Sequence, residues 1–175
     1  QNVISHFMKK LKIKTFLLLF SICILSCNSN KKIERQNEPT IYNVEENDVE
    51  MNKAIEKAKQ TIDSFDYAFK NNSRVFTFFG LKKKFEENGN VEHIWIGNIQ
   101  KIESGKYIGV IDNLPEKIKS VKLGDTVQIE KKEISDWMYI KKSELHGGYT
   151  IRLLRERMTE EERKKFDAES GMKIN

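Results

Sequence analysis

Residues 74–113, RVFTFFGLKKKFEENGNVEHIWIGNIQKIESGKYIGVIDN, decide the fold, because they hold three runs rich in β-branched and aromatic residues. The first run ends at Glu87-Asn88-Gly89-Asn90, and Asn-Gly is a strong hairpin signal since both residues accept positive φ. Ser104-Gly105 turns the chain a second time. The stretch therefore predicts an antiparallel meander with strands over 74–87, 91–103 and 106–113.

Strand patterns continue after this meander. Asn113-Leu114-Pro115 breaks the third strand, and a tight turn at Gly124-Asp125, inside residues 121–129, leads into a short strand. Residues 136–141 and 145–151 then have the pattern of a final hairpin around Lys142-Ser143-Glu144. The sequence thus predicts a sheet of five or six strands.

A helical pattern precedes the sheet. Apolar residues recur there at three- and four-residue steps, as on one face of a helix. Asn47 or Asp48 is placed to cap its start, and Asn71-Asn72 to end it. The helix either packs on the sheet or lies on a membrane surface, and its narrow apolar stripe favours the sheet. The stripe consists of Met51, Ala54, Ile55, Ala58, Ile62, Phe65 and Phe69.

A short C-terminal helix is indicated by Thr159 and Glu162, which fit a capping box, and by Gly171, which fits a helix stop. The expected fold is therefore α+β. An N-terminal amphipathic helix packs on a curved antiparallel sheet, and a short helix closes the domain. A partly closed barrel is the alternative form of this sheet.

The N-terminus has the layout of a secretory signal. Lysines follow Met8, and the apolar run 15–25 is shorter than the about 20 residues of a transmembrane helix. Cys27 directly after Ser26 makes the segment resemble a bacterial lipoprotein signal, in which the cysteine is acylated and becomes the first mature residue. The alternative is an ordinary cysteine beside a cleaved signal or a short membrane anchor. The expected parts are an upstream extension plus signal peptide over 1–26, a lipidated Cys27 with a flexible tether over 27–47, and one domain over 48–175.

Charge and cysteine usage narrow the function classes. The chain has 31 basic and 26 acidic residues, but four of its lysines precede Cys27, which leaves 27 basic residues against 26 acidic ones. A nucleic-acid binder keeps its basic excess in the folded part, so we expect no nucleic-acid partner. Cys23 and Cys27 are the only cysteines. Beyond Cys27 there is thus no thiol for a nucleophile, a zinc-thiolate site or a disulfide.

The second half of the chain carries several distinctive blocks in a fixed order. They are Glu92-His93-Ile94-Trp95, Asn113-Leu114-Pro115, VKLGD (121–125), ISDWMY (134–139), GGYT (147–150), RERM (155–158), Glu162-Arg163, Asp167 and GMKI (171–174). Over residues 93–174 the chain resembles the YegJ-like bacterial domain, a domain of unknown function numbered 2314 in that series. It departs from that pattern at Ser170, where a tryptophan is expected. The resemblance implies a fold and no established chemistry.

Residues 134–139 bring together an aspartate and two aromatic side chains, and are the strongest candidate for a catalytic or ligand-binding site. In a strand, Asp136 shares a face with Met138 and Ile140, while Trp137 and Tyr139 lie on the other face. Trp137 either packs in the core while Asp136 accepts backbone N–H bonds, or Asp136 is a base or ligand beside an aromatic wall. The structural role is favoured.

Glycine and histidine candidates lie nearby. Gly147-Gly148 suits a bulge or the close approach of a ligand, and no phosphate-loop or dinucleotide motif is present. His93, His146 and Asp136 have the residue types of a two-histidine, one-carboxylate metal site. Their spacing shows no local ligand motif, so we expect no metal and no cofactor.

Arginines near the C-terminus form a basic strip that alternates with glutamates. Arg152 and Arg155 belong to it, and the strip is either a salt-bridged surface or a binding site for an acidic partner or lipid head groups.

The leading hypothesis is a non-enzymatic, lipid-anchored interaction or binding module of the bacterial cell envelope. Acyl chains on Cys27 would hold it to a membrane, facing the periplasm, where it meets an envelope protein or ligand. One alternative is a small-ligand binder or hydrolase-type enzyme, and another is a protective, immunity-type protein. The enzyme site would use Asp136, Tyr139, His93, His146 and Arg152 for chemistry, and Trp137, Gly147, Gly148 and Arg155 for binding.

Overall fold

The structure is a computed structural model that describes residues 32–35, 38–42, 48–103 and 105–175. The chain divides into two compact units, Gln1–Val44 and Glu45–Asn175. In the first unit, β1 (Lys32–Arg35) and β2 (Glu38–Tyr42) pair as an antiparallel two-stranded sheet. These strands fall where the sequence predicts a flexible tether. Met8, the apolar run and Cys27 lie outside the described residues.

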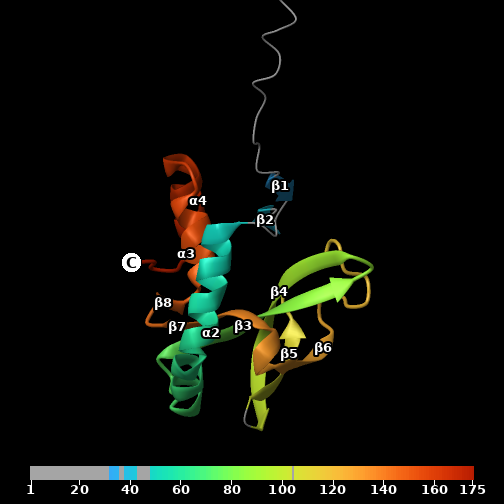
Figure 1. Cartoon of the computed structure of the whole chain (residues 1–175). Coiled ribbons are helices and arrows are strands. Elements are labelled where there is room, and N and C mark those ends of the chain that lie inside the picture. The colour runs from blue at the N-terminus through green and yellow to red at the C-terminus, as the bar shows by residue number, and fades with distance from the viewer. Residues whose placement is uncertain (1–31, 36–37, 43–47, 104) are drawn as a thin grey trace, which may run out of the picture. The chain divides into compact units, whose positions relative to one another are not determined.

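The second unit is an α+β domain, as the sequence predicts (Figure 1). Its sheet has six antiparallel strands in the order β6-β5-β4-β3-β7-β8, so β6 and β8 are the outer strands and the sheet does not close into a barrel. The elements are α2 (Val49–Lys70), β3 (Phe76–Glu87), β4 (Asn90–Glu103), β5 (Lys106–Ile111), β6 (Thr126–Glu130), the 3-10 turn η1 (Lys131–Glu133), β7 (Ile134–Lys141), β8 (Glu144–Gly147), α3 (Tyr149–Glu156) and α4 (Glu160–Ser170).

The predicted meander is present as β3, β4 and β5. Glu87 pairs with Asn90 across the first turn, and Asn88 and Gly89 have φ of 50° and 77°, as Asn-Gly in a tight hairpin requires. The other edge of β3 pairs with β7, and the paired residues are at least 51 positions apart in the chain; Lys82, for example, pairs with Asp136. Strand β3 is therefore central, and its side chains are held from both sides.

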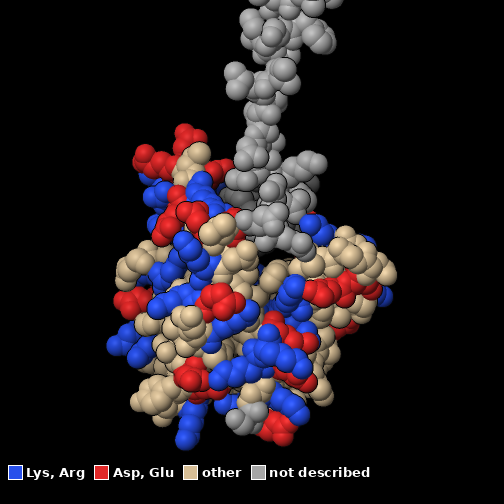
Figure 2. Space-filling model, viewed as in Figure 1, with Lys and Arg blue, Asp and Glu red and all other residues tan. Residues whose placement is uncertain are grey.

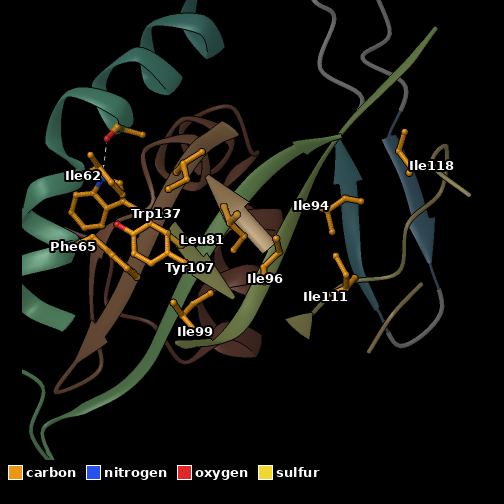
Figure 3. Close-up of a cluster of buried hydrophobic side chains, with 13 residues drawn as sticks. Ile62, Phe65, Leu81, Ile94, Ile96, Ile99, Tyr107, Ile111, Ile118 and Trp137 are labelled. Atoms are coloured by element: carbon orange, nitrogen blue, oxygen red, sulfur yellow. Dashed lines mark hydrogen bonds between the residues drawn. The ribbon is translucent and has the colours of Figure 1, made fainter. Parts of the chain in front are cut away.

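Helix α2 covers one face of this sheet. Asp48 caps it, since its Oδ1 accepts the backbone N–H of Met51 at 3.0 Å. The expected stripe is buried or partly buried, and Phe65 lies with Tyr107 and Trp137 in the core (Figure 3). Burying one such side chain contributes about 1.5–3 kcal/mol to folding. The apolar face of α2 therefore packs on the sheet, as its narrow stripe predicts. In the part of the chain that the structure describes, none of the helices has the length and apolarity that a membrane crossing requires.

The prediction of a strand over 145–151 is wrong in its second half. Strand β8 ends at Gly147, and helix α3 begins at Tyr149. Gly147 and Gly148 have φ of 70° and 61°, a left-handed conformation that turns the chain out of the sheet. The C-terminal helix is confirmed as α4, with the capping box of Thr159 and Glu162 and with Gly171 in the left-handed region at its end.

Candidate functional site

The carboxylate of Asp136 is buried at the start of α3, and both of its oxygens accept hydrogen bonds. Oδ1 accepts the backbone N–H of Trp137 at 2.8 Å and that of Tyr149 at 3.2 Å. Oδ2 accepts the backbone N–H of Thr150 at 2.8 Å and its hydroxyl at 2.7 Å. Asp136 thus satisfies the first N–H groups of α3 from a neighbouring strand, a capping role.

Lys82 of β3 reaches the same hydroxyl. Its Nζ donates to Thr150 Oγ1 at 3.2 Å and lies 5.4 Å from the centroid of the Trp95 ring. Burial lowers the pKa of Lys82, and the charge of Asp136 acts against that shift. Burial likewise raises the pKa of Asp136, against the hydrogen bonds from Thr150 and the charge of Lys82. Lys82, Thr150 and Asp136 therefore form one partly desolvated polar cluster that joins β3, β7 and α3.

Trp95 is held in place from the next loop. Its backbone N–H donates to Asn113 Oδ1 at 2.7 Å. The neighbouring Glu92 accepts the backbone N–H groups of Lys117 at 2.9 Å and of Ile118 at 3.2 Å. The loop between β5 and β6 is thus fixed to β4 beside Trp95.

His93 lies on the same face of β4 as Trp95. Burial, followed by the charges of Lys82, Lys84 and Lys59, lowers the pKa of His93 to about 4. Its Nδ1 is buried and has no hydrogen-bond partner among the described residues. The imidazole is therefore neutral at pH 7 and adds no charge to the cluster.

Trp137 and Tyr139 lie on the opposite face of β7, in contact with α2. The Trp137 indole donates to the Ala58 carbonyl at 3.0 Å, and its ring stacks on Tyr139 with centroids 6.0 Å apart. Tyr139 also stacks on His146, at 4.6 Å. Burial is the main cause that raises the pKa of Tyr139 and lowers that of His146. These rings belong to the aromatic core, away from Asp136.

The two glycines form the turn from β8 to α3. A Cβ added to Gly147 would lie 2.3 Å from the Trp137 carbonyl oxygen and 2.5 Å from its ring. A Cβ on Gly148 would lie 2.9 Å from Leu145. The space that a ligand would need beside Gly147 is thus filled by Trp137.

The arginines are engaged within the domain. The guanidinium of Arg152 donates to the carbonyl oxygens of Gly147 at 2.9 Å, Leu145 at 2.6 Å and Asn175 at 2.6 Å. Arg155 makes a two-point contact with Asp167, with both distances 2.7 Å, which joins α3 to α4. Such bidentate pairs are geometrically specific.

The residues predicted as one catalytic site are therefore divided. Asp136 and His93 lie on one face of the sheet, on either side of Lys82, whereas Tyr139 and His146 lie on the other face. Within the described residues, no three His, Cys, Asp or Glu side chains gather closely enough to hold a metal ion.

Sequence reasoning missed Lys82 and Thr150 as members of the polar cluster, and Trp95 as the ring that lies next to Lys82. Trp95 and Thr150 belong to the blocks of sequence that carry the family resemblance, two residues after His93 and Gly148 respectively. Lys82 had a weaker signal, because it is one of three consecutive lysines and no local pattern distinguishes it from Lys83 and Lys84. The pairing of β3 with β7 was needed to bring it to Asp136.

A shallow, open hollow lies elsewhere, at the C-terminal end of α2. It is lined by Asp66, Tyr67, Phe69, Lys70 and Lys101. Asp66 in this hollow accepts hydrogen bonds from Lys101 at 2.8 Å and from the Tyr107 hydroxyl at 2.7 Å, which tie α2 to the sheet.

Comparisons place the chain among bacterial proteins. The sequence pattern of a family described as an uncharacterized protein conserved in bacteria, DUF2314, matches residues 48–174. A putative ankyrin repeat protein of Neisseria meningitidis serogroup B (strain ATCC BAA-335 / MC58) is 35% identical over 144 residues, 77% of this chain and 56% of that protein. The uncharacterized protein YegJ of Escherichia coli (strain K12) is 35% identical over 101 residues, 58% of this chain and 64% of that protein. The chain thus spans less than two thirds of the length of either relative. No solved structure matches it.

Proposed function

Because the chain belongs to the bacterial family DUF2314, whose description assigns no activity, we propose a function from the chain's own residues: a non-enzymatic binding module tethered to a membrane of the cell envelope. Acyl chains on Cys27 anchor it, and its folded domain faces the periplasm. An envelope protein or a ligand is its partner.

One observation carries the non-enzymatic part of this proposal. Two of the side chains predicted for catalysis, Asp136 and Arg152, use their hydrogen-bonding capacity inside the fold. Asp136 accepts four hydrogen bonds from Trp137, Tyr149 and Thr150. Arg152 donates to three carbonyl oxygens. A general base or an anion-binding arginine needs free capacity directed at a substrate.

The anchoring part rests on the sequence before the domain. The lysines after Met8, the short apolar run and Cys27 after Ser26 together have the form of a lipoprotein signal. Each methylene of an acyl chain buried in a bilayer contributes about 0.8 kcal/mol, so two or more chains give stable attachment. On the face that Figure 2 shows, Lys and Arg side chains are interspersed with Asp and Glu. A near-neutral domain is compatible with such an anchor, since it needs no basic surface to stay at the membrane.

Metabolic labelling with a clickable fatty acid tests the anchor. We expect the wild-type chain to be labelled and to fractionate with membranes, and Cys27→Ala to lose both the label and the membrane association. Cys23→Ala is the matched control, since it removes the other cysteine of the chain and should keep the label. A labelled Cys27→Ala chain, or an unlabelled wild-type chain in the soluble fraction, contradicts the proposal.

Capture from native membranes tests the binding part. The wild-type chain, cross-linked in intact cells, should recover a stoichiometric envelope protein or ligand. Recovery of neither counts against a binding module.

A further inference from the structure

Four side chains form a square on one face of the β3–β4 hairpin. Lys82 is directly opposite Trp95, and Lys84 is directly opposite His93. Side chains two residues apart in a strand share a face, so all four lie together. We call these four residues, Lys82, Lys84, His93 and Trp95, the lysine–indole patch. Lys84 is exposed and the other three are partly exposed, so the patch is open at the surface.

The ammonium of Lys82 has unused donor capacity. A lysine ammonium carries three N–H donors. Among the described residues, Lys82 Nζ donates only to Thr150 Oγ1, at 3.2 Å, and the Trp95 ring lies beneath it at 5.4 Å. The nearby carboxylate of Asp136 already accepts from Trp137, Tyr149 and Thr150. A partly desolvated cation with free donors is stabilised by an added acceptor.

Positive charge converges on this patch. Lys82, Lys84 and Lys59 all act on the His93 imidazole, whose Nδ1 is buried without a partner among the described residues. Three acids oppose them: Asp136 acts on Lys82, Glu86 pairs with Lys84, and Glu56 pairs with Lys59 at 2.8 Å. The two glutamates are exposed, and exposed pairs contribute little, so a more highly charged anion can replace them.

We propose that the lysine–indole patch binds a phosphate-type anion. Lys82 and Lys84 supply the charge and the N–H donors, and the indole of Trp95 supplies a flat apolar surface for the group that carries the anion. Lysine binds phosphate as a point charge, which suits two cations that lie on the same face of one strand. The inference rests on the proposed binding function and gives it a ligand class. A soluble phosphate compound and a lipid head group share this chemistry.

Tryptophan fluorescence provides the assay. The full chain carrying Cys27→Ser is titrated with inorganic pyrophosphate and, separately, with vesicles of phosphatidylglycerol or of phosphatidylcholine. Trp95 is partly exposed at the patch, whereas Trp137 is 3% exposed and packed under α2, so a specific change reports on Trp95. We expect a saturable change with pyrophosphate, with phosphatidylglycerol vesicles or with both. Pyrophosphate alone identifies a soluble source, and phosphatidylglycerol without phosphatidylcholine identifies a lipid head group.

Neighbouring lysines provide the variant and its control. Lys84→Gln should weaken binding at least about tenfold, the loss expected for one charge-assisted contact. Lys84 is exposed, so this variant keeps the fold. Lys83→Gln makes the same charge change one residue away, but Lys83 pairs with Glu133 at 2.9 Å and donates to the Gln128 carbonyl at 2.8 Å, on the other face. It should bind within about twofold of the parent chain.

Three results overturn the inference. They are the absence of saturation with either probe, equal affinity in Lys84→Gln and the parent chain, and equal loss in Lys83→Gln and Lys84→Gln. Acylation of Cys27 is measured by labelling and does not enter this titration. The failure of the anion site is therefore distinguishable from the failure of the anchor.

Discussion

Asp136 and Thr150 lie fourteen residues apart and are joined by two hydrogen bonds, from the backbone N–H and the hydroxyl of Thr150 to Asp136 Oδ2, at 2.8 and 2.7 Å. The same hydroxyl accepts from Lys82. This contact fixes the start of α3 to β7 and links both to β3. A buried network of this kind stabilises a fold only while every member is satisfied.

Asp136→Asn should lower the free energy of unfolding by about 2–4 kcal/mol, because the amide keeps one acceptor oxygen and turns its NH₂ group toward N–H donors. Urea denaturation followed by circular dichroism measures this loss. Asp63→Asn is the control, since the side chain of Asp63 is 85% exposed and pairs with Lys131, which is itself exposed. Its midpoint should stay close to that of the wild type. Equal midpoints for both variants would mean that the Asp136 network contributes little.

Gly147→Ala should be strongly destabilising, by about 3 kcal/mol or more, since left-handed strain is combined with a clash in the core. The new Cβ would lie 2.3 Å from the Trp137 carbonyl oxygen, and Gly147 has φ of 70°. Gly124→Ala is a matched control with φ of 87° and no atom within 4 Å of the new Cβ. It should cost only about 1–2 kcal/mol. Thermal unfolding of the two variants separates the effect of the clash from that of the backbone strain. Similar losses of stability in Gly147→Ala and Gly124→Ala would rule the clash out.

Trp137→Phe should destabilise the domain by about 1–3 kcal/mol, because it leaves the Ala58 carbonyl without the indole N–H and removes ring volume from the core. Trp95→Phe changes the same ring type on the partly exposed face and should cost less. Denaturant midpoints measured by circular dichroism test the order. A larger loss for Trp95→Phe contradicts the placement of Trp137 under α2.

His93 should make stability depend on pH between about 4 and 6.5. Burial and nearby lysines lower its pKa in the folded state to about 4, from an ordinary 6.5. Between these two pH values the unfolded chain binds more protons than the folded chain. The contribution of His93 to the free energy of unfolding is therefore complete above pH 6.5 and is lost as the pH falls toward 4. The contribution is at most about 3.5 kcal/mol, since each of the 2.5 pKa units corresponds to about 1.4 kcal/mol.

The free energy of unfolding of His93→Gln should therefore fall less steeply than that of the wild type from pH 6.5 to 4.5. His146→Gln is the control and should keep the slope that His93 contributes. An NMR titration in which the His93 ring protonates near pH 6.5 in the folded protein would contradict this account.

Local patterns predicted much of the domain. The stripe of α2, the Asn88-Gly89 turn, the capping box of Thr159 and the stop at Gly171 each depend on residues close in sequence, and all four are present. The helix α3 was missed because the pattern GGYT (147–150) is locally typical of a strand with a bulge. Its N-terminal N–H groups find their acceptor in Asp136, on a different strand, and no local pattern shows this.

The candidate site shows the same division. The alternation of 134–139 correctly placed Asp136 opposite Trp137 and Tyr139, since side-chain direction in a strand follows from its period of two. Whether Asp136, His93, Tyr139 and His146 meet depends instead on which strands pair and in what register, and those pairings are long-range.

The sequence by itself determined the main elements of the domain other than α3, the α+β class, the family and the near-neutral charge after Cys27, because these follow from composition, spacing and local turn chemistry. Only the tertiary structure decided that β3 lies between β4 and β7, which brings Lys82 to Trp95 on one side and to Asp136 on the other. The physical reason is that strand pairing joins backbone groups that are far apart in the chain. The register of that pairing, rather than any local preference, selects which side chains become neighbours.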